Sequence, residues 1–106
     1  MDLVRGFQRG AMALHVLHHA GPDGGRQGVH GAWLAAELAR HGYRVSPGTL
    51  YPLLSRMESA GLLTSRSEVV GGHRRRSYRA TRKGRRALAS CRKALEELSS
   101  EILGSP

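Results

Sequence analysis

The stretch Ser46-Pro47-Gly48-Thr49-Leu50-Tyr51-Pro52-Leu53-Leu54-Ser55-Arg56-Met57-Glu58-Ser59-Ala60-Gly61-Leu62 predicts a short helix with one apolar side and one small, polar side. Ser46 can cap free backbone N–H groups with its hydroxyl, and Pro47 suits the first helical position because no hydrogen bond is lost there. Gly61 is typical of the residue that follows a last helical turn. The buried face should consist of four apolar residues spaced i, i+3, i+4 and i+7, namely Leu50, Leu53, Leu54 and Met57.

Two more helices are expected before this one. Apolar residues recur at helical spacing from Phe7 to Ala20 and again from Gly31 to His41. The composition of Gly21–Gly28 predicts a loop between these two helices. A short turn that contains Gly42 joins the second helix to the helix at Ser46, so this pair matches the helix-turn-helix pattern.

A hairpin should follow the third helix. Leu62–Val70 and Arg74–Ala80 have the character of strands, and Gly71-Gly72-His73 forms a tight connection that can supply positive φ. Because a two-stranded ribbon alone is only marginally stable in water, we expect this hairpin to pack against the helices.

A last helix should begin after Thr81, which can cap it, and run to about Leu103. Its apolar residues are spaced 3, 4, 3, 4, which is typical of a seam between two helices and favours dimerisation over packing within the chain's own core. We therefore expect a winged helix-turn-helix DNA-binding domain over residues 1–81 and a C-terminal dimerisation helix over residues 82–106, packed on the same domain. The fold class is mainly α with a small β-hairpin. The predicted dimerisation residues are Leu88, Cys91, Leu95, Leu98 and Ile102.

The charge of the chain favours an anionic partner. The 106 residues carry a net charge of +9, and the sequence pI is about 11.3. The charge is uneven, because residues 1–53 hold five Arg and three acids whereas residues 54–106 hold twelve Lys or Arg and five acids. The block from Arg74 to Lys93 could be a solvated face, but apolar positions continue through it at helical spacing, which favours a folded, anion-binding segment.

The polar side of the third helix and the hairpin tip are the candidate DNA contacts. Small residues let a helix approach base edges closely, hydroxyls can donate or accept, and a guanidinium can bind phosphate or guanine. Arginines at a hairpin tip suit phosphates or a narrow minor groove, and strand alternation should place Arg75 on the face opposite Arg74 and Arg76. An ordinary surface helix is the alternative. The predicted DNA-binding residues are Ser46, Gly48, Thr49, Tyr51, Ser55, Arg56, Arg74, Arg75 and Arg76.

Three segments resemble the PadR family of winged-helix transcriptional regulators. They are Ser46-Pro47-Gly48-Thr49-Leu50-Tyr51-Pro52-Leu53-Leu54, Arg56-Met57-Glu58-Ser59-Ala60-Gly61-Leu62-Leu63 and Arg75-Arg76-Ser77-Tyr78-Arg79-Ala80-Thr81-Arg82-Lys83-Gly84. Pro52, which breaks the rule against proline inside a helix, belongs to the first of them. The resemblance implies a winged-helix DNA-binding domain, a dimer built on the last helix and, usually, repression.

The function we expect is a sequence-specific, dimeric DNA-binding regulator, a repressor released by an unknown signal. Its partners would be double-stranded DNA with a pseudo-palindromic operator and a second copy of the chain. The alternative is a winged-helix protein–protein docking module, because a fold does not determine a function. Catalysis has no candidate residues, since the acids are scattered and no phosphate-binding glycine loop follows a strand.

Two features point weakly to ligands. His15, His18 and His19 lie on one side of the first helix and could share a metal, but no carboxylate lies near them in sequence, so we expect no metal and no cofactor. Some PadR members bind aromatic ligands through a tryptophan between dimer helices. The only tryptophan here is Trp33, in the second helix, and it is expected in the core or at an interface.

Cysteine content and hydropathy indicate the redox environment of the chain and whether it can span a membrane. Cys91 is the only cysteine, which excludes an intrachain disulfide and is typical of a reducing, cytoplasmic setting. We expect it to act as a small apolar residue of the dimer seam, with a redox-sensing thiol as the alternative. No apolar run is long enough to span a membrane, and the N-terminus lacks the pattern of a signal peptide.

Overall fold

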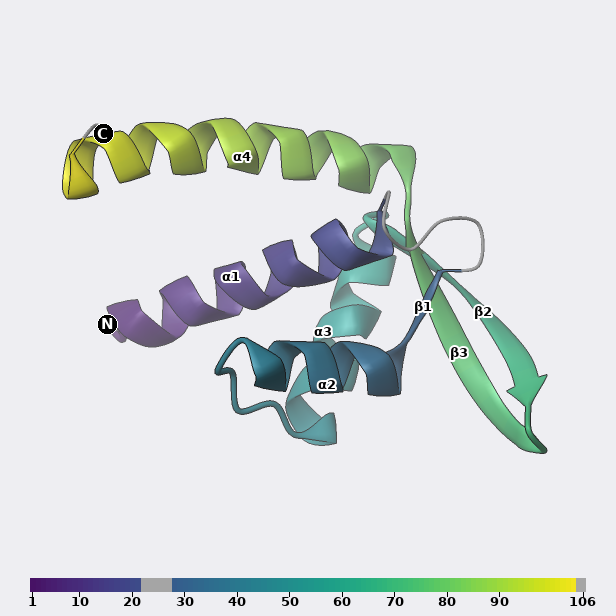
Figure 1. Cartoon of the computed structure of the whole chain (residues 1–106). Helices are drawn as coiled ribbons and strands as arrows, with labels where there is room; N and C mark the ends of the chain where they lie inside the picture. The colour runs from purple at the N-terminus through teal and green to yellow at the C-terminus, as the bar shows by residue number, and fades with distance from the viewer. Residues whose placement is uncertain (22–27, 105–106) are drawn as a thin grey trace.

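The computed structural model describes residues 1–21 and 28–104. It contains four helices and a small sheet among these residues (Figure 1). Most of the predicted Gly21–Gly28 loop lies outside the described residues. The elements in chain order are α1 (Leu3–Ala20), β1 (Val29–His30), α2 (Gly31–Arg40), α3 (Pro47–Ser59), β2 (Leu63–Val70), β3 (His73–Ala80) and α4 (Arg82–Leu103).

The first helix begins four residues earlier than the predicted start at Phe7. Asp2 is its N-cap, and the Asp2 carboxylate accepts a hydrogen bond from the backbone N–H of Arg5 at 3.0 Å. This cap satisfies one of the N–H groups that every helix leaves free at its start. The apolar spacing from Phe7 onward did not indicate this earlier start, because the first turn of α1 is exposed on all sides.

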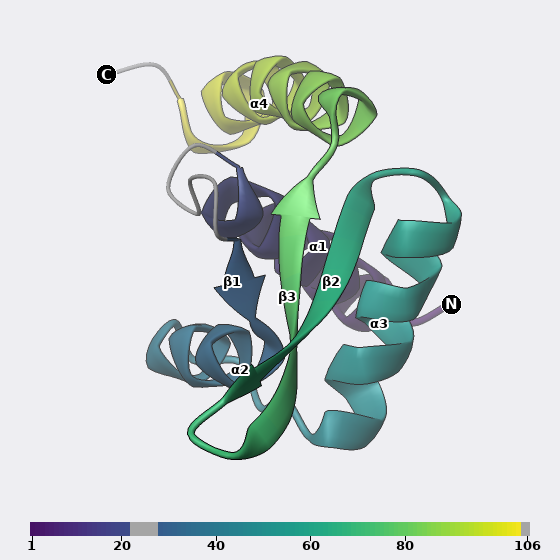
Figure 2. The same cartoon turned by 90° about the vertical axis from the view of Figure 1, so that its right-hand side faces the viewer.

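The sheet has three antiparallel strands in the order β1-β3-β2, so the prediction of a hairpin alone was incomplete. Figure 2 shows the sheet between α2 and α3, and Figure 1 shows the β2–β3 hairpin extending away from both helices. The short strand β1 pairs Val29 with Tyr78 and His30 with Ser77. Two residues are too few to show strand alternation in a sequence.

The hairpin has a tighter connection than predicted. Val70 pairs with His73, so His73 belongs to β3 and only Gly71 and Gly72 form the loop. Both glycines have positive φ, at 57° and 80°, as the favoured two-residue hairpin turn requires. The tip of the hairpin is therefore a short and well-defined turn.

The core lies where α1, α2, α3 and the sheet meet. The predicted apolar face of α3 is confirmed, because Leu50, Leu53, Leu54 and Met57 are all at most 7% exposed. The remaining buried apolar residues come from the first two helices and the sheet: Val16, Leu17, Ala20, Leu34, Leu38, Leu63, Tyr78 and Ala80.

The two ends of α3 differ in how they are capped. Ser46 is the N-cap residue, but its side chain bonds no backbone N–H, so the predicted hydroxyl cap is wrong. Its carbonyl accepts from the N–H groups of Thr49 and Leu50 instead, both at 3.0 Å. At the other end, Gly61 has φ of 80° and Leu62 N–H donates to the carbonyl of Met57, which is the Schellman closure.

The turn after α3 is bonded directly to the start of α4. Thr81 caps α4 as predicted, by accepting from the N–H of Gly84 at 3.0 Å, while its own N–H and hydroxyl donate to the carbonyls of Leu62 and Gly61. Lys83 Nζ donates to the carbonyl of Ala60 at 2.7 Å. A Cβ atom at Gly84 would overlap the carbonyl oxygen of Leu62, so only glycine lets α4 come this close. We call these contacts the α3–α4 joint.

Candidate nucleic-acid interface

The exposed side of α3 carries the residues that the sequence predicted for DNA contact. Gly48, Thr49, Ser55 and Arg56 are all exposed, on the side opposite the buried leucines. The hydroxyls of Ser46 and Thr49 are 3.2 Å apart and therefore orient one another at the start of the helix. This surface presents small hydrogen-bonding groups, one guanidinium and little bulk, which suits close approach to base edges.

Tyr51 has a more structural position than predicted. Its ring lies against Gly31, the first residue of α2, and a Cβ atom at Gly31 would be only 2.8 Å from Cε1 of the ring. The tyrosine is still 46% exposed. Gly31 thus permits the close crossing of α2 and α3, a role that the sequence did not reveal because the partner of a glycine cannot be read from spacing.

The three arginines at the hairpin tip lie on two faces of the ribbon, as strand alternation predicted. Nη1 of Arg76 donates to the hydroxyl of Ser65 at 3.0 Å, and Nη1 of Arg74 donates to that of Ser67 at 3.2 Å. Arg75 pairs across the ribbon with Glu68, on the other face. All three arginines are exposed.

The face with Arg74 and Arg76 is the one that meets α3. Ser65, which accepts from Arg76, donates to the Glu58 carboxylate of α3 at 2.8 and 2.9 Å. This bond connects the ribbon to the helix. Burial raises the pKa of Tyr78, which lies on the same face. Glu68 on the other face is bonded to His30 of β1 at 2.7 Å, which ties the third strand to the hairpin.

The predicted dimer seam on α4 divides into two parts. Leu88 is partly buried and packs on the chain's own core, so it is not simply a surface residue of the seam. Cys91 is exposed, and Leu95, Leu98 and Ile102 are 52%, 42% and 69% exposed. The heptad pattern cannot distinguish these two environments, because the helix turns the same stripe first toward its own core and then toward solvent.

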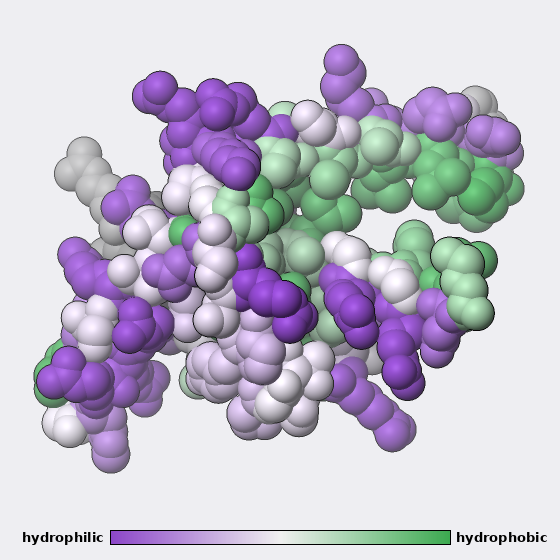
Figure 3. All heavy atoms as spheres, turned by 180° about the vertical axis from the view of Figure 1, so that it is seen from behind, coloured by the Kyte–Doolittle hydropathy of each residue, from purple (hydrophilic) through white to green (hydrophobic). Residues whose placement is uncertain are grey.

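The N-terminal turns of α1 extend this exposed apolar surface. Figure 3 shows apolar atoms along the side of α4 that faces α1 and again at the N-terminal end of α1, with an open gap between them. We call this region the α1–α4 apolar surface. Apart from residues already named, its large apolar side chains are Met1, Leu3, Val4, Phe7 and Leu103.

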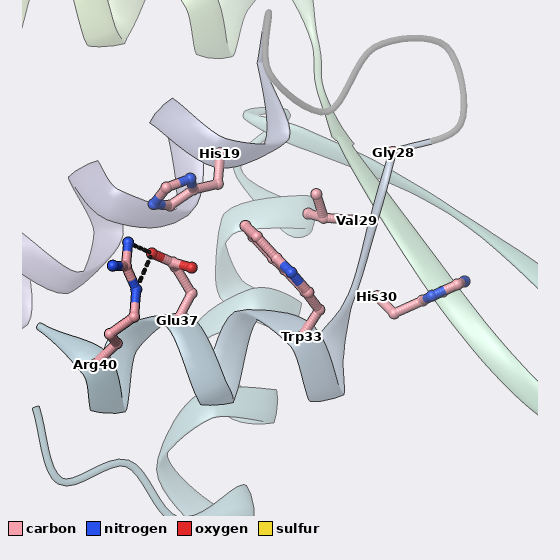
Figure 4. A pocket seen from close by; sticks show the side chains of 7 residues that line it. All are labelled: His19, Gly28, Val29, His30, Trp33, Glu37 and Arg40. Carbon is pink, nitrogen blue, oxygen red and sulfur yellow. Dashed lines mark hydrogen bonds and ion pairs between the residues drawn. The ribbon is translucent and has the colours of Figure 1, made fainter.

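Trp33 was expected in the core or at an interface, and the structure excludes the core position. It is 46% exposed and lines an open hollow of about 520 Å³ between α1, α2 and β1. Figure 4 shows Trp33 rising from α2, with His19 of α1 and Glu37 of α2 turned toward each other beside it. Arg40 donates two hydrogen bonds to Glu37, at 2.6 and 3.0 Å, and this bonding lowers the pKa of Glu37.

The histidines of α1 are grouped differently from the prediction. His15 and His19 lie together with His41, the residue that follows α2, whereas His18 is not in this group of the described residues. Burial lowers the pKa of His15, and nearby His41, His19 and His18 lower it further. His41 had no sequence signal, because it is 22 residues from His19 and only the packing of α1 on α2 brings them together.

These elements define a class of fold. Two helices joined by a short turn, followed by a hairpin that projects beside the second of them, are a winged helix-turn-helix, and the fold prediction is confirmed in this respect. Within the described residues, no helix is long and apolar enough to cross a bilayer.

The chain belongs to the PadR-like family of transcriptional regulators, whose family model matches residues 16–90. The chain is 60% identical to the transcriptional regulator Rv3488 of Mycobacterium tuberculosis over 101 residues, which is 95% of this chain and 91% of that protein. Both names describe a transcriptional regulator, a class that is generally not enzymatic. The resemblance inferred from the three sequence segments is thereby confirmed.

Solved structures agree with this assignment. A PadR family transcriptional regulator from Eggerthella lenta is 33% identical, with a TM-score of 0.78 over 95% of this chain and 86% of that chain. A PadR-like transcription factor from Bacteroides fragilis is 22% identical and also has a TM-score of 0.78, over 96% of each chain. The second likeness concerns the fold alone.

Proposed function

We propose that the chain is a dimeric repressor that binds a specific DNA operator through α3 and the hairpin. The observation that carries this proposal is the position of the exposed polar side of α3 beside Arg74 and Arg76, on the ribbon face that is bonded to α3 through Ser65 and Glu58. A helix with a basic ribbon at its side fits a major groove and the phosphates that border it.

The residues proposed to contact DNA have three different tasks. Thr49 and Ser55 carry the hydroxyls for base edges, with Gly48 leaving room for the approach. Arg56 and the ribbon arginines supply charge for phosphates or guanine. Ser46 orients Thr49, and Tyr51 reaches the DNA backbone from the α2–α3 crossing, since nearly half of its surface is exposed.

The second copy of the chain would cover the α1–α4 apolar surface. Large apolar side chains gathered at one end of the molecule favour a protein partner over water. The same stripe continues from Cys91 to Ile102 on α4, which is the geometry of an interhelical seam. Two copies related by a two-fold axis would present two α3 helices to half-sites separated by about 10 base pairs or a multiple of that spacing.

Repression results if the bound dimer occupies a promoter and an unknown signal releases it. PadR regulators generally act as dimers on DNA, and the family resemblance implies repression. A reporter gene placed behind the bound DNA should be expressed less when the chain is present, and substitutions on the exposed side of α3 should relieve the effect.

Salt dependence tests DNA binding most directly. A dimer that neutralises about 6 phosphates should lose on the order of 10³ in affinity between 50 and 200 mM salt. The measurement is fluorescence anisotropy with the duplex that lies upstream of the chain's own reading frame, compared with a shuffled duplex of the same composition. A docking module, the alternative function, would bind neither duplex appreciably at any salt concentration.

A further inference from the structure

Three histidines, two in α1 and one directly after α2, converge at one place. His15 and His19 are one turn apart on α1, and His41 follows the last residue of α2. One ring nitrogen from each lies within 4.8 Å of the other two. The ring centroids of His15 and His41 are only 4.7 Å apart. None of these residues belongs to the proposed DNA contacts, so a role for this cluster is independent of the proposed function.

The spacing of the three nitrogens is close to that of a metal site. Imidazole nitrogens bind zinc at about 2.0–2.1 Å, which places two ligands of a tetrahedral site about 3.4 Å apart. Small side-chain rotations would therefore bring all three nitrogens to one ion. Two histidines at i and i+4 on a helix are a recurrent pair of ligands, and here the third is the residue that follows α2.

Neighbouring side chains already orient the imidazoles. The edge of Tyr43 lies against His15, with ring centroids 5.3 Å apart, and Trp33 lies edge-on to His19 at the same centroid distance. Glu37 Oε1 is 3.3 Å from Nε2 of His41. A carboxylate that bonds one nitrogen of a histidine fixes the ring and leaves the other nitrogen for a metal.

We propose that His15, His19 and His41 bind a divalent transition-metal ion, with Glu37 as the positioning residue for His41. Imidazole donors favour Zn²⁺, Ni²⁺, Cu²⁺ and Co²⁺ over Mg²⁺ and Ca²⁺, which need oxygen ligands. His41 is exposed, so the ion would keep a position open to water or a fourth ligand. The bound ion would link α1 to the residue that precedes the turn into α3.

A Co²⁺ titration of the full chain, without a histidine tag, tests this site. Trp33 is the only tryptophan and contacts His19, so paramagnetic Co²⁺ should quench its fluorescence to a plateau at one ion per chain. Zn²⁺ should displace Co²⁺ and restore the signal. The absorption bands of bound Co²⁺ should show nitrogen ligands and no thiolate band, because Cys91 is not in the group. A thiolate band, or no saturable quenching up to millimolar Co²⁺, would overturn the proposal.

Single substitutions identify the ligands. His15→Gln and His41→Gln should each weaken metal binding by about 100-fold or more, and Glu37→Gln by about 10-fold, since even outer-shell partners contribute about 10- to 100-fold. His18→Gln is the matched control, because His18 is exposed and adjacent to His19 in α1 but is outside the group. It should bind metal as the unmodified chain does.

Thermal unfolding without metal shows whether a variant has lost only a metal-binding side chain or has lost its folded structure. His15→Gln and His41→Gln should unfold near the temperature of the unmodified chain without metal. Zn²⁺ should stabilise the unmodified chain and His18→Gln fully, Glu37→Gln less, and His15→Gln and His41→Gln least. If His41→Gln keeps its affinity, or if His18→Gln loses as much as His15→Gln, the three histidines are not the site.

Discussion

The exposed side of α3 and the exposed side of α4 are both unusual for a small domain, but in opposite ways. The α3 side shows hydroxyls, a glycine and one guanidinium group, all of which are stable in water without any partner. The α4 side shows large apolar side chains, among them Leu95 at 52% and Ile102 at 69% exposure. The α3 surface is suited to reversible binding of an anion, whereas the α4 surface is suited to a permanent protein partner.

The largest effect should come from a charge on the α4 surface. Leu98→Glu removes an apolar group that is 42% exposed in the single chain and occurs twice in a dimer. The lost burial and the unpaired carboxylates should cost about 3 kcal/mol, or roughly 100-fold in dimer affinity. Sedimentation equilibrium measures this change. Ala89→Glu, on the opposite side of α4, adds the same charge and should leave the dimer intact. Equal weakening by both variants would mean that net charge, not the seam, controls assembly.

A smaller effect is expected from the ribbon. Arg76→Ala should weaken binding to every duplex by about 2 kcal/mol per dimer, roughly 30-fold, and reduce the salt slope by about 2, because two phosphate contacts are lost. Arg75→Ala should have less effect, since Arg75 lies on the ribbon face away from α3. Fluorescence anisotropy at several salt concentrations measures the affinity and the salt slope of both variants.

A charge control for the ribbon is available on α4. Arg92→Ala removes one exposed arginine there and should change the salt slope little. If Arg75→Ala proves the more damaging ribbon variant, DNA must lie against the other face of the hairpin, and the comparison of the two faces must be reversed.

The smallest effect concerns sequence preference. Thr49→Ala should change the preference among related duplexes by about 1 kcal/mol, a factor of about 5, with little change in average affinity. Competition binding with a set of single-base variants of the operator measures the preference. Ser59→Ala, on the last turn of α3, is a matched removal of a hydroxyl and should leave it unchanged. Uniform weakening by Thr49→Ala would place this residue on the phosphate backbone.

The sequence predicted the elements whose signal is periodic. The buried face of α3 and the cap at Thr81 could be assigned because spacing and residue type alone determine them. What could not be predicted depends on contacts between distant segments. The pairing of β1 with β3, the packing of Tyr51 on Gly31 and the approach of His41 to His15 have no local pattern. Leu88 fits the heptad as well as Leu95 does, and only the packed structure shows that Leu88 contacts the core whereas Leu95 is exposed.

The α3–α4 joint holds the start of α4 against the turn that follows α3. The 22 residues of α4 extend for about 33 Å at 1.5 Å per residue. If two copies meet along this helix, a tilt of about 10° at its base would displace its far end by about 6 Å, close to two base-pair steps of about 3.4 Å. In such a dimer, the missing side chain of Gly84 would influence operator length, because it lets α4 begin close to the carbonyl of Leu62. It would act through the angle of α4, and the proposed DNA contacts and dimer seam would not need to include it.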